Sequence, residues 1–362
     1  MVLGLALSAC GGSAEAPRAA ALPANPPRPA GCTPPTSTDL TKPGGWLNRI
    51  VSAPQTVGLV VDDGRGRVVS HEADSPMVLA SAVKVVHLTA YAAAVADGRI
   101  RPDERVSRAD WERWYVAGTD GGVHPLALQR LGPGPDYTVD QLVSAMIQDS
   151  DNAAPDWLRA RLGDDALRAA AASTGWNDVD LPNYAGAAAR LARPDLAPAG
   201  APREQLAQVD AQLGRRVADD PAFHAEVEQR LATAAQQDPE RYVADSQAWS
   251  TTNSRGTAAQ LYGLYRAIAT GTVPGADVAV RHLTWQGPTE VGTLGFKGGT
   301  FVNVLTFGSF LRRPDGSTGY AVILGADLPL TPTTTEQIPG QQQLALAALV
   351  SPQAFDRLVC VA

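Results

Sequence analysis

The sequence predicts an α+β fold in which an antiparallel sheet is assembled from both ends of the chain around an all-helical insert. Runs of β-branched and aromatic residues lie between residues 57 and 69 and again between 291 and 324, whereas helical spacing dominates the segment between them. A closing helix is predicted over about residues 341–358. With 362 residues, 44% of them hydrophobic, the chain can bury a sizeable core.

The folded domain is expected to start at Trp46 with a hairpin and a buried helix. Two apolar runs, residues 57–61 and 68–69, flank the letters Asp-Asp-Gly-Arg-Gly, which are typical of a tight turn between antiparallel strands. Residues 82–96 carry almost no charge and stop at Gly98. This pattern predicts a largely buried helix that has Ser81 at its start.

The middle of the chain is predicted to be helical over about residues 106–248. Residues 106–199 are expected to form an all-α region, and the charged residues 203–247 are expected to be exposed helices added to the fold. An amphipathic helix over 249–271 follows. Strands are then predicted over 291–296, 301–310 and 319–324, and a turn at 313–316 joins the last two.

The beginning of the chain is expected to lie outside the domain. Residues 11–45 hold eight of the 28 prolines without hydrophobic periodicity, which predicts a disordered tether. Before it, the letters Leu-Ser-Ala-Cys ending at Cys10 resemble the lipobox of a bacterial lipoprotein, although the usual positively charged region is missing. Either the true start codon lies upstream or the match is accidental. The first alternative predicts a truncated signal peptide over 1–10, a lipid on Cys10 and an exported protein anchored to the outer face of the membrane.

Charge and cysteine content narrow the class of function. The 37 acidic residues outnumber the 30 basic ones, which argues against a nucleic-acid partner. No apolar stretch is long enough to span a bilayer, so membrane contact is expected only through the lipid. If Cys10 is lipidated, Cys32 and Cys360 remain as a pair, and a disulfide is favoured over two free thiols. The five scattered histidines are interpreted as structural or surface residues, so neither a metal site nor a cofactor is expected.

Lysine is rare in this chain, which draws attention to its positions. Of the 30 basic residues, 27 are arginine and only Lys42, Lys84 and Lys297 are lysine. Ser81 and Lys84 are three positions apart at a helix start, so the amine can reach the hydroxyl and activate it as a nucleophile. A helix-start serine followed by a surface lysine is the commoner explanation of this spacing. The residues around Lys84 are apolar, however, and a buried lone ammonium is costly.

Two further segments carry related side chains. Residues 150–152, Ser-Asp-Asn, are predicted on a turn between helices, where they either face a cleft or cap the next helix. Residues 297–300, Lys-Gly-Gly-Thr, are predicted where one strand ends and the next begins. Their glycines either let a ligand approach the strand edge or form a plain turn.

In this order, the three segments resemble the S-x-x-K, S-D-N and K-T-G signature of the serine β-lactamase and penicillin-binding protein superfamily, over about residues 55–328. The resemblance implies a class A β-lactamase-like fold for residues 46–362. It implies Ser81 as the nucleophile, with Lys84 and Ser150 as the proton-shuttling network. It implies Lys297 as the electrostatic partner of Ser150 and of the substrate carboxylate.

The same resemblance implies the groups that hold the substrate. Asn152, Gly299 and Thr300 take the substrate-binding positions. The backbone N–H groups of Ser81 and Thr300 would form the oxyanion hole.

Two departures from the family pattern are expected to matter. Gly298 replaces the threonine of the third motif, and Thr300 either compensates for the lost hydroxyl or leaves recognition changed. The glutamate with which class A enzymes activate water has no clear counterpart after residue 152. The carboxylates near the expected loops are Asp178, Asp180, Asp238 and Glu240, of which Glu240 is ranked first.

The leading hypothesis is an exported serine hydrolase that acts on a β-lactam or a D-alanyl peptide through an acyl-enzyme. A D,D-carboxypeptidase-like or slow penicillin-binding enzyme is the nearest alternative, and a non-catalytic wall-binding lipoprotein is the alternative from another class. The partner is a small molecule or a wall peptide, and a monomer is expected. The missing glutamate predicts that acylation is easier than deacylation.

Overall fold

The computed structural model describes residues 21–362, and in this part of the chain the main antiparallel sheet has six strands in the order β2-β1-β10-β9-β8-β7. β1 (Val57–Asp62) and β2 (Val68–His71) form the predicted hairpin, and β1 pairs with β10 (Thr318–Gly325). β9 (Val304–Arg312), β8 (Gly292–Phe301) and β7 (Pro288–Thr289) complete the sheet. The predicted α+β class, with a sheet assembled from both chain ends, is confirmed.

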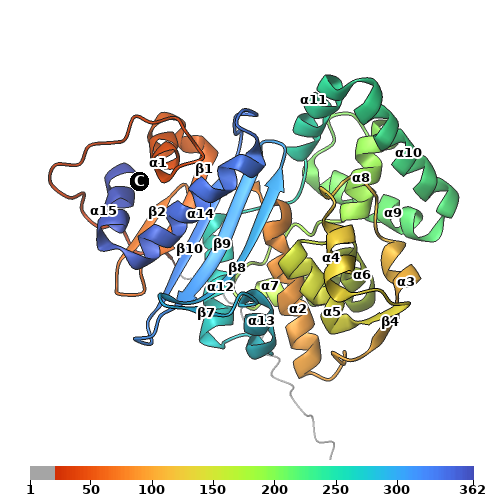
Figure 1. Cartoon of the computed structure of the whole chain (residues 1–362), viewed down its shortest axis with the longest axis horizontal. Coiled ribbons are helices and arrows are strands. Elements are labelled where there is room, and N and C mark those ends of the chain that lie inside the picture. Colours follow the sequence, from red (N-terminus) through yellow and green to blue (C-terminus); the bar gives the residue numbers. More distant parts are fainter. Residues whose placement is uncertain (1–20) are drawn as a thin grey trace, which may run out of the picture.

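Helices cover both faces of this sheet (Figure 1). One face packs against α1 (Pro43–Ser52), α14 (Thr334–Val350) and α15 (Pro352–Val361). The other packs against α12 (Ala258–Thr270) and, at β8, against α13 (Ala276–Leu283), with α2 (Lys84–Ala96) packed on these helices. Along β1, Leu59 and Val61 belong to the first core and Val60 to the second. The strand is therefore apolar at both alternating positions because both of its faces are buried.

The helical region begins with a short sheet, which corrects the prediction of an all-α segment. β4 (Arg105–Ser107) pairs with β5 (Asp136–Thr138). The remaining elements up to residue 192 are helices, namely α3 (Arg108–Glu112), α4 (Val123–Leu131), α5 (Val139–Ser144), the π-helical turn η3 (Ala145–Asp149), α6 (Ala153–Leu162), α7 (Asp164–Ala172) and α8 (Tyr184–Ala192). The β4–β5 pair is only three residues long on each side, too short to leave an alternating pattern in the sequence.

The inserted helices are α9 (Arg203–Asp219), α10 (Pro221–Gln237) and α11 (Pro239–Ser250), and they are more than exposed additions. Apolar residues are few here, but Phe223, Val227 and Leu231 follow one face of α10 and pack with α8 into a separate core. α8 and α9 cross closely at Gly186, where a Cβ would collide with the backbone of Asp210. The insert therefore has its own small core and is fixed to α8.

Three predicted boundaries are wrong. β8 continues through residues 297–300 to Phe301, so the Lys-Gly-Gly-Thr segment lies inside a strand and not between two. The predicted helix over 249–271 is divided, because α11 ends at Ser250 and α12 begins at Ala258 behind a Thr257 cap. The closing helix is also two helices, since Pro352 starts a new one and has no backbone N–H to continue the first.

Within residues 21–362, no single helix has the length and apolar composition of a membrane span. α14 and α15 reach that composition only jointly, across a bend of 116°.

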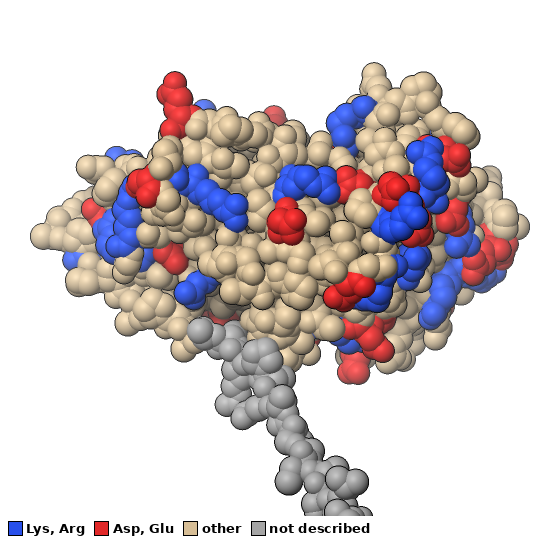
Figure 2. Space-filling model, turned by 90° about the horizontal axis from the view of Figure 1, so that it is seen from below, with Lys and Arg blue, Asp and Glu red and all other residues tan. Residues whose placement is uncertain are grey.

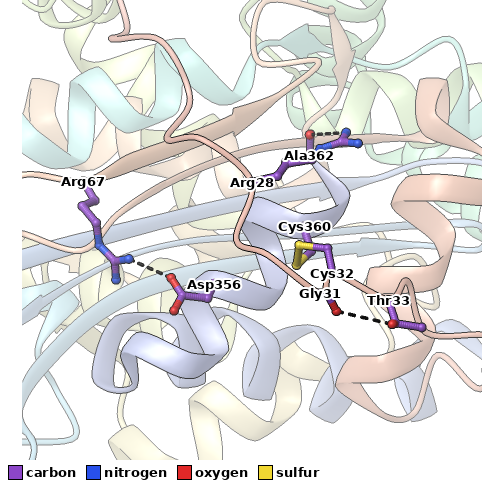
Figure 3. Close-up of a disulfide and its surroundings, with 8 residues drawn as sticks. All are labelled: Arg28, Gly31, Cys32, Thr33, Arg67, Asp356, Cys360 and Ala362. Carbon is purple, nitrogen blue, oxygen red and sulfur yellow. Dashed lines mark hydrogen bonds and ion pairs between the residues drawn. A yellow bond between two sulfur atoms is a disulfide. The ribbon is translucent and has the colours of Figure 1, made fainter.

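Residues 21–42 follow the surface of the domain, which differs from the disordered tether predicted for 11–45. The Asn25 side chain bonds the backbone N–H and C=O of Ser70 in β2, each at 2.8 Å. The predicted disulfide between Cys32 and Cys360 is present and ties this segment to α15 (Figure 3). Polar pairing and the covalent link thus fasten a segment that lacks hydrophobic periodicity. Cys10 and the predicted signal peptide lie outside the described residues.

Surface charges are mixed in sign. Figure 2 shows basic and acidic side chains interspersed over the face seen there, with many of both over the helical half. Exposed pairs such as Arg241 with Asp245, 2.8 Å apart on α11, are typical of this surface. Pairs of this kind contribute little to stability.

Candidate active site

Ser81 lies in the short 3-10 turn η2 (Ala80–Val83), which leads directly into α2. The preceding residue, Ala80, is buried with a φ of 47°, a left-handed conformation that is strained for a residue with a side chain. Ser81 lines a cavity of about 820 Å³. Within residues 21–362 its hydroxyl has no hydrogen-bond partner, so it faces the cavity unengaged.

Lys84 is completely buried, and its amine is held by the turn that follows η3. Nζ donates to the backbone oxygen of Ser150 and to Oδ1 of Asn152, each at 2.6 Å, and lies 3.3 Å from Ser150 Oγ. The predicted direct bond from Lys84 to Ser81 is absent from the described residues. Burial, and then the positive charge of Lys297, lower the pKa of Lys84 well below its ordinary value.

Ser150 lies between two amines. It caps η3 in the left-handed conformation, with a φ of 69°. Lys297 Nζ donates to Ser150 Oγ at 2.9 Å and to the backbone oxygen of Gly298 at 2.6 Å. Lys297 is 4% exposed, and burial lowers its pKa to about 7. A hydroxyl that bridges two amines of lowered pKa can pass a proton between them.

Asp151, the middle residue of the turn, does not line the cavity, and its side chain forms hydrogen bonds that fix the turn. Its buried carboxylate accepts from Trp111 Nε1 at 3.1 Å, from the Ala154 backbone N–H at 2.6 Å and from His124 Nδ1 at 2.5 Å. Burial alone would lower the pKa of His124, but the Asp151 carboxylate raises it above its ordinary value. This buried network fixes the positions of Ser150 and Asn152 on either side.

The two glycines after Lys297 have different surroundings. A Cβ on Gly299 would lie 2.5 Å from the Ser81 nitrogen and 2.7 Å from the Ala82 nitrogen, so β8 passes directly against η2. A Cβ on Gly298 would meet its nearest atom at 3.5 Å, an ordinary contact. Glycine is therefore required at 299 and not at 298. Thr300 follows, exposed, on the wall of the cavity.

The structure does not bring the carboxylates favoured by the sequence to this cavity. Glu240 is exposed on the first turn of α11 and does not line the cavity. Asp238 caps α11, Asp178 bonds Gln260, and Asp180 pairs with Arg203 at 2.8 Å. Each of these aspartates therefore has a structural partner away from Ser81.

Two cavity residues were not predicted from the sequence. Asp120 is the only carboxylate that lines the cavity within residues 21–362, and its oxygens accept from the backbone N–H groups of Gly122 and His124, each at 2.9 Å. Tyr184 starts α8 with its ring centre 4.6 Å from Lys84 Nζ. Its buried hydroxyl has no partner among the described residues. Three glycines around Asp120 indicate a loop in the sequence. No local sequence pattern indicates that Tyr184 lies beside Lys84.

The described part of the chain contains no cluster of side chains that could bind a metal ion. No group of three or more histidine, cysteine, aspartate or glutamate side chains is close enough there to hold an ion.

Comparisons with known proteins agree with the geometry. A family model described as the beta-lactamase enzyme family matches residues 47–273, more than half of the chain. A β-lactamase from Sphaerobacter thermophilus is similar in structure, with a TM-score of 0.54 and 19% identity over 82% of this chain and 91% of that one. A mutant class A β-lactamase of the last common ancestor of Gram-negative bacteria, bound to 5(6)-nitrobenzotriazole, gives a TM-score of 0.50 and 18% identity over 83% and 93%. No curated protein matches the sequence.

Proposed function

We propose that this chain, which belongs to the beta-lactamase enzyme family, is a serine hydrolase that forms an acyl-enzyme on Ser81 with a β-lactam or a D-alanyl peptide. The observation that carries the proposal is the position of Ser150 Oγ, 3.3 Å from Lys84 Nζ and 2.9 Å from Lys297 Nζ, on the cavity that Ser81 lines. Three chain segments converge here.

The acylation step follows from the hydrogen bonds of Lys84. A neutral amine keeps its two 2.6 Å bonds, to Ser150 O and Asn152 Oδ1, and has one lone pair left. In the step, the Ser81 oxygen bonds to the substrate carbonyl carbon and its proton passes to Lys84. The C–N bond then breaks, the leaving nitrogen takes the Ser150 hydroxyl proton, and Lys84 returns its proton to Ser150.

Deacylation is proposed to be slow. It requires water to attack the acyl-serine while a base takes the water proton, and loss of such a base costs roughly 10² to 10⁴-fold in rate. Asp120 is the only carboxylate lining the cavity within the described residues, and both of its oxygens already accept backbone N–H bonds. The ring of Tyr184 occupies the space beside Lys84. This supports a penicillin-binding or D,D-carboxypeptidase-like activity as the second candidate.

A pre-steady-state experiment with nitrocefin tests the proposal. We expect a burst of about one equivalent per protein, followed by slow turnover. Ser81→Ala should abolish the burst, whereas Ser173→Ala, at an exposed serine of the α7 C-terminus, should keep it. A burst that survives in Ser81→Ala, or no reaction of the wild-type protein with any β-lactam or D-alanyl peptide, would contradict the proposal.

Export and lipid anchoring through Cys10 are proposed on sequence grounds, and the Cys32–Cys360 disulfide supports an oxidising compartment. A Cys10→Ala protein expressed from the full gene should leave the membrane fraction. Its retention there in full would overturn the anchor.

A further inference from the structure

The cavity extends from Ser81 between helices that each present one face to it. α8 contributes Tyr184, Ala188 and Leu191, and α11 contributes Tyr242, Val243, Ser246 and Trp249. On each helix, residues at the spacing i, i+4, i+7 form one stripe, and Val243 lies beside the stripe of α11. α14, which packs on the sheet, contributes Ile338 together with the polar side chains of Thr334, Thr335, Gln341 and Gln342. α8 and α14, together with the inserted helix α11, thus form one wall of the cavity that Ser81 lines.

This wall is fixed in place before any ligand arrives. Trp249 Nε1 donates to the Ala187 carbonyl of α8 at 2.8 Å, and its ring packs edge-on against Phe301 at 5.2 Å. Ser250 Oγ donates to Asn303 Oδ1 in the β8–β9 turn at 2.7 Å. α11 is therefore held by both halves of the molecule, and a ligand would not have to order it.

The wall is uncharged, and its α8 and α11 part is mainly apolar, whereas α14 adds two threonines and two glutamines. Among the described residues that α8, α11 and α14 contribute to the cavity, none is charged; Asp120 and Lys297 come from other elements. Val243 of α11 lines the cavity and is 39% exposed. Ser246 is 6% exposed, and its Oγ has no hydrogen-bond partner within residues 21–362. A buried hydroxyl without a partner on a cavity wall is a place for a ligand atom.

We infer that the α8 and α11 part of this wall binds the acyl arm of the substrate, and that this arm is uncharged and mainly apolar, with one polar group that bonds Ser246 Oγ. The inference rests on the proposed function, because Ser81 is taken as the point of attachment. The volume of about 820 Å³ is in the upper part of the range for small-molecule sites and leaves room for an aromatic or branched arm. A charged arm is disfavoured because no opposite charge on this wall would compensate its desolvation.

Benzylpenicillin and carbenicillin differ by one carboxylate on the arm and are the probes. The wild-type protein should be acylated by benzylpenicillin at least about tenfold faster than by carbenicillin. Val243→Lys should slow benzylpenicillin by about tenfold and reverse the preference, because it places a cation beside the arm carboxylate. Leu126→Lys, at an exposed leucine of α4 that does not line the cavity, is the matched control and should change neither rate.

Ser246→Ala provides a second variant with little risk to folding, because the hydroxyl has no internal partner. It should slow benzylpenicillin by about twofold to tenfold, the value of one neutral hydrogen bond. Equal rates for the two penicillins in the wild type, or an equal loss for both in Val243→Lys, would overturn the inference.

Calorimetric binding to Ser81→Ala separates this inference from the proposed function. If the wild type is not acylated but Ser81→Ala binds benzylpenicillin over carbenicillin, and Val243→Lys reverses the order, the wall binds the arm and the proposed reaction is wrong. If the wild type is acylated without an arm preference, the inference alone fails. If neither binding nor acylation occurs, both fail.

Discussion

The two sides of the cavity are built in opposite ways. The side formed by η2, the turn after η3 and β8 is polar, with two buried lysines and strained backbone at Ala80 and Ser150. The side formed by α8, α11 and α14 has no charge among its described lining residues, and its α8 and α11 part is mainly apolar. We propose that the first side carries out the chemistry and that the second selects the substrate. Substitutions on the first side should therefore change rate with every substrate, and those on the second should change the order of substrates.

The polar side gains its properties from burial. Burial lowers the pKa of both lysines, and the nearby charge of Lys297 lowers that of Lys84 further. The cost is compensated by short bonds to backbone and amide oxygens. A lysine can supply a neutral amine in this setting, whereas an arginine remains charged. This explains why lysine is kept here in a chain that otherwise uses arginine.

Lys84→Arg should have the largest effect on the polar side. The guanidinium cannot accept the Ser81 proton, so the acylation rate should fall by roughly 10² to 10⁴-fold with every β-lactam. Stopped-flow acylation measures this loss, and the thermal unfolding midpoint reports whether the fold survives. Lys84→Met removes the amine without adding charge and should be equally slow. A Met variant that acylates at the wild-type rate would show that Lys84 is not the proton acceptor.

Gly299→Ala should be next in size, with Gly298→Ala as its matched control. The added methyl at 299 meets the Ser81 and Ala82 nitrogens, so β8 or η2 must move, at a cost of about 1–3 kcal/mol. Acylation by both penicillins should fall together by about tenfold or more. Gly298→Ala has room and should change stability and rate little. Similar effects at both positions would contradict the close approach of β8 to η2.

The sequence could predict the parts of the fold and site that depend on local pattern. The hairpin at β1–β2, the apolar helix α2 and the pairing of Cys32 with Cys360 follow from turn letters, charge-free spacing and cysteine parity. The family resemblance added the convergence of residues 81, 150 and 297, which no local pattern contains.

The rest depends on tertiary contacts. Lys84 bonds Ser150 and Asn152 and not Ser81, because the turn after η3 brings two acceptors to the buried amine. Tyr184 reaches Lys84 through the packing of α8 on α6, a placement that sequence spacing cannot reveal. Chain position alone favours Glu240 as the carboxylate that activates water, but α11 places its side chain in solvent.

The pH dependence of acylation should report Lys297, with an effect of about tenfold per pH unit. Its pKa is lowered to about 7, so the charge that would hold a substrate carboxylate is lost as pH rises above that value. Acylation of the free enzyme at low substrate should therefore fall above pH 7. Lys297→Arg stays charged, so its acylation rate should not fall above pH 7. A fall that persists in Lys297→Arg would show that another group causes the pH dependence.

The same lowered pKa gives a stability effect of known sign. Between pH 7 and 10.5 the unfolded chain binds more protons at Lys297 than the folded chain does, so the free energy of unfolding rises with pH in this window. The thermal unfolding midpoint of the wild type should therefore rise relative to that of Lys297→Met as the pH increases from 7 to 10.5. A constant difference would contradict the burial of the charge.

Removal of the disulfide should have the smallest effect on acylation, because the disulfide belongs to neither side of the cavity. Cys32 and Cys360 are 328 residues apart, and a cross-link closing so long a loop stabilises by about 2–5 kcal/mol. The double variant Cys32→Ala/Cys360→Ala should unfold at lower temperature yet acylate within about twofold of the wild type at 25 °C. A large loss of acylation with the fold intact would couple α15 to the cavity.

Peptide mapping of the acyl adduct tests the central claim most directly. After brief incubation with benzylpenicillin and rapid acid quench, intact mass should rise by one β-lactam, and tandem mass spectrometry should locate the adduct on Ser81. The Ser81→Ala protein should carry none, while Ser173→Ala should be labelled as the wild type is. An adduct on another residue, or full labelling of Ser81→Ala, would contradict the assignment of the polar side of the cavity to chemistry at Ser81.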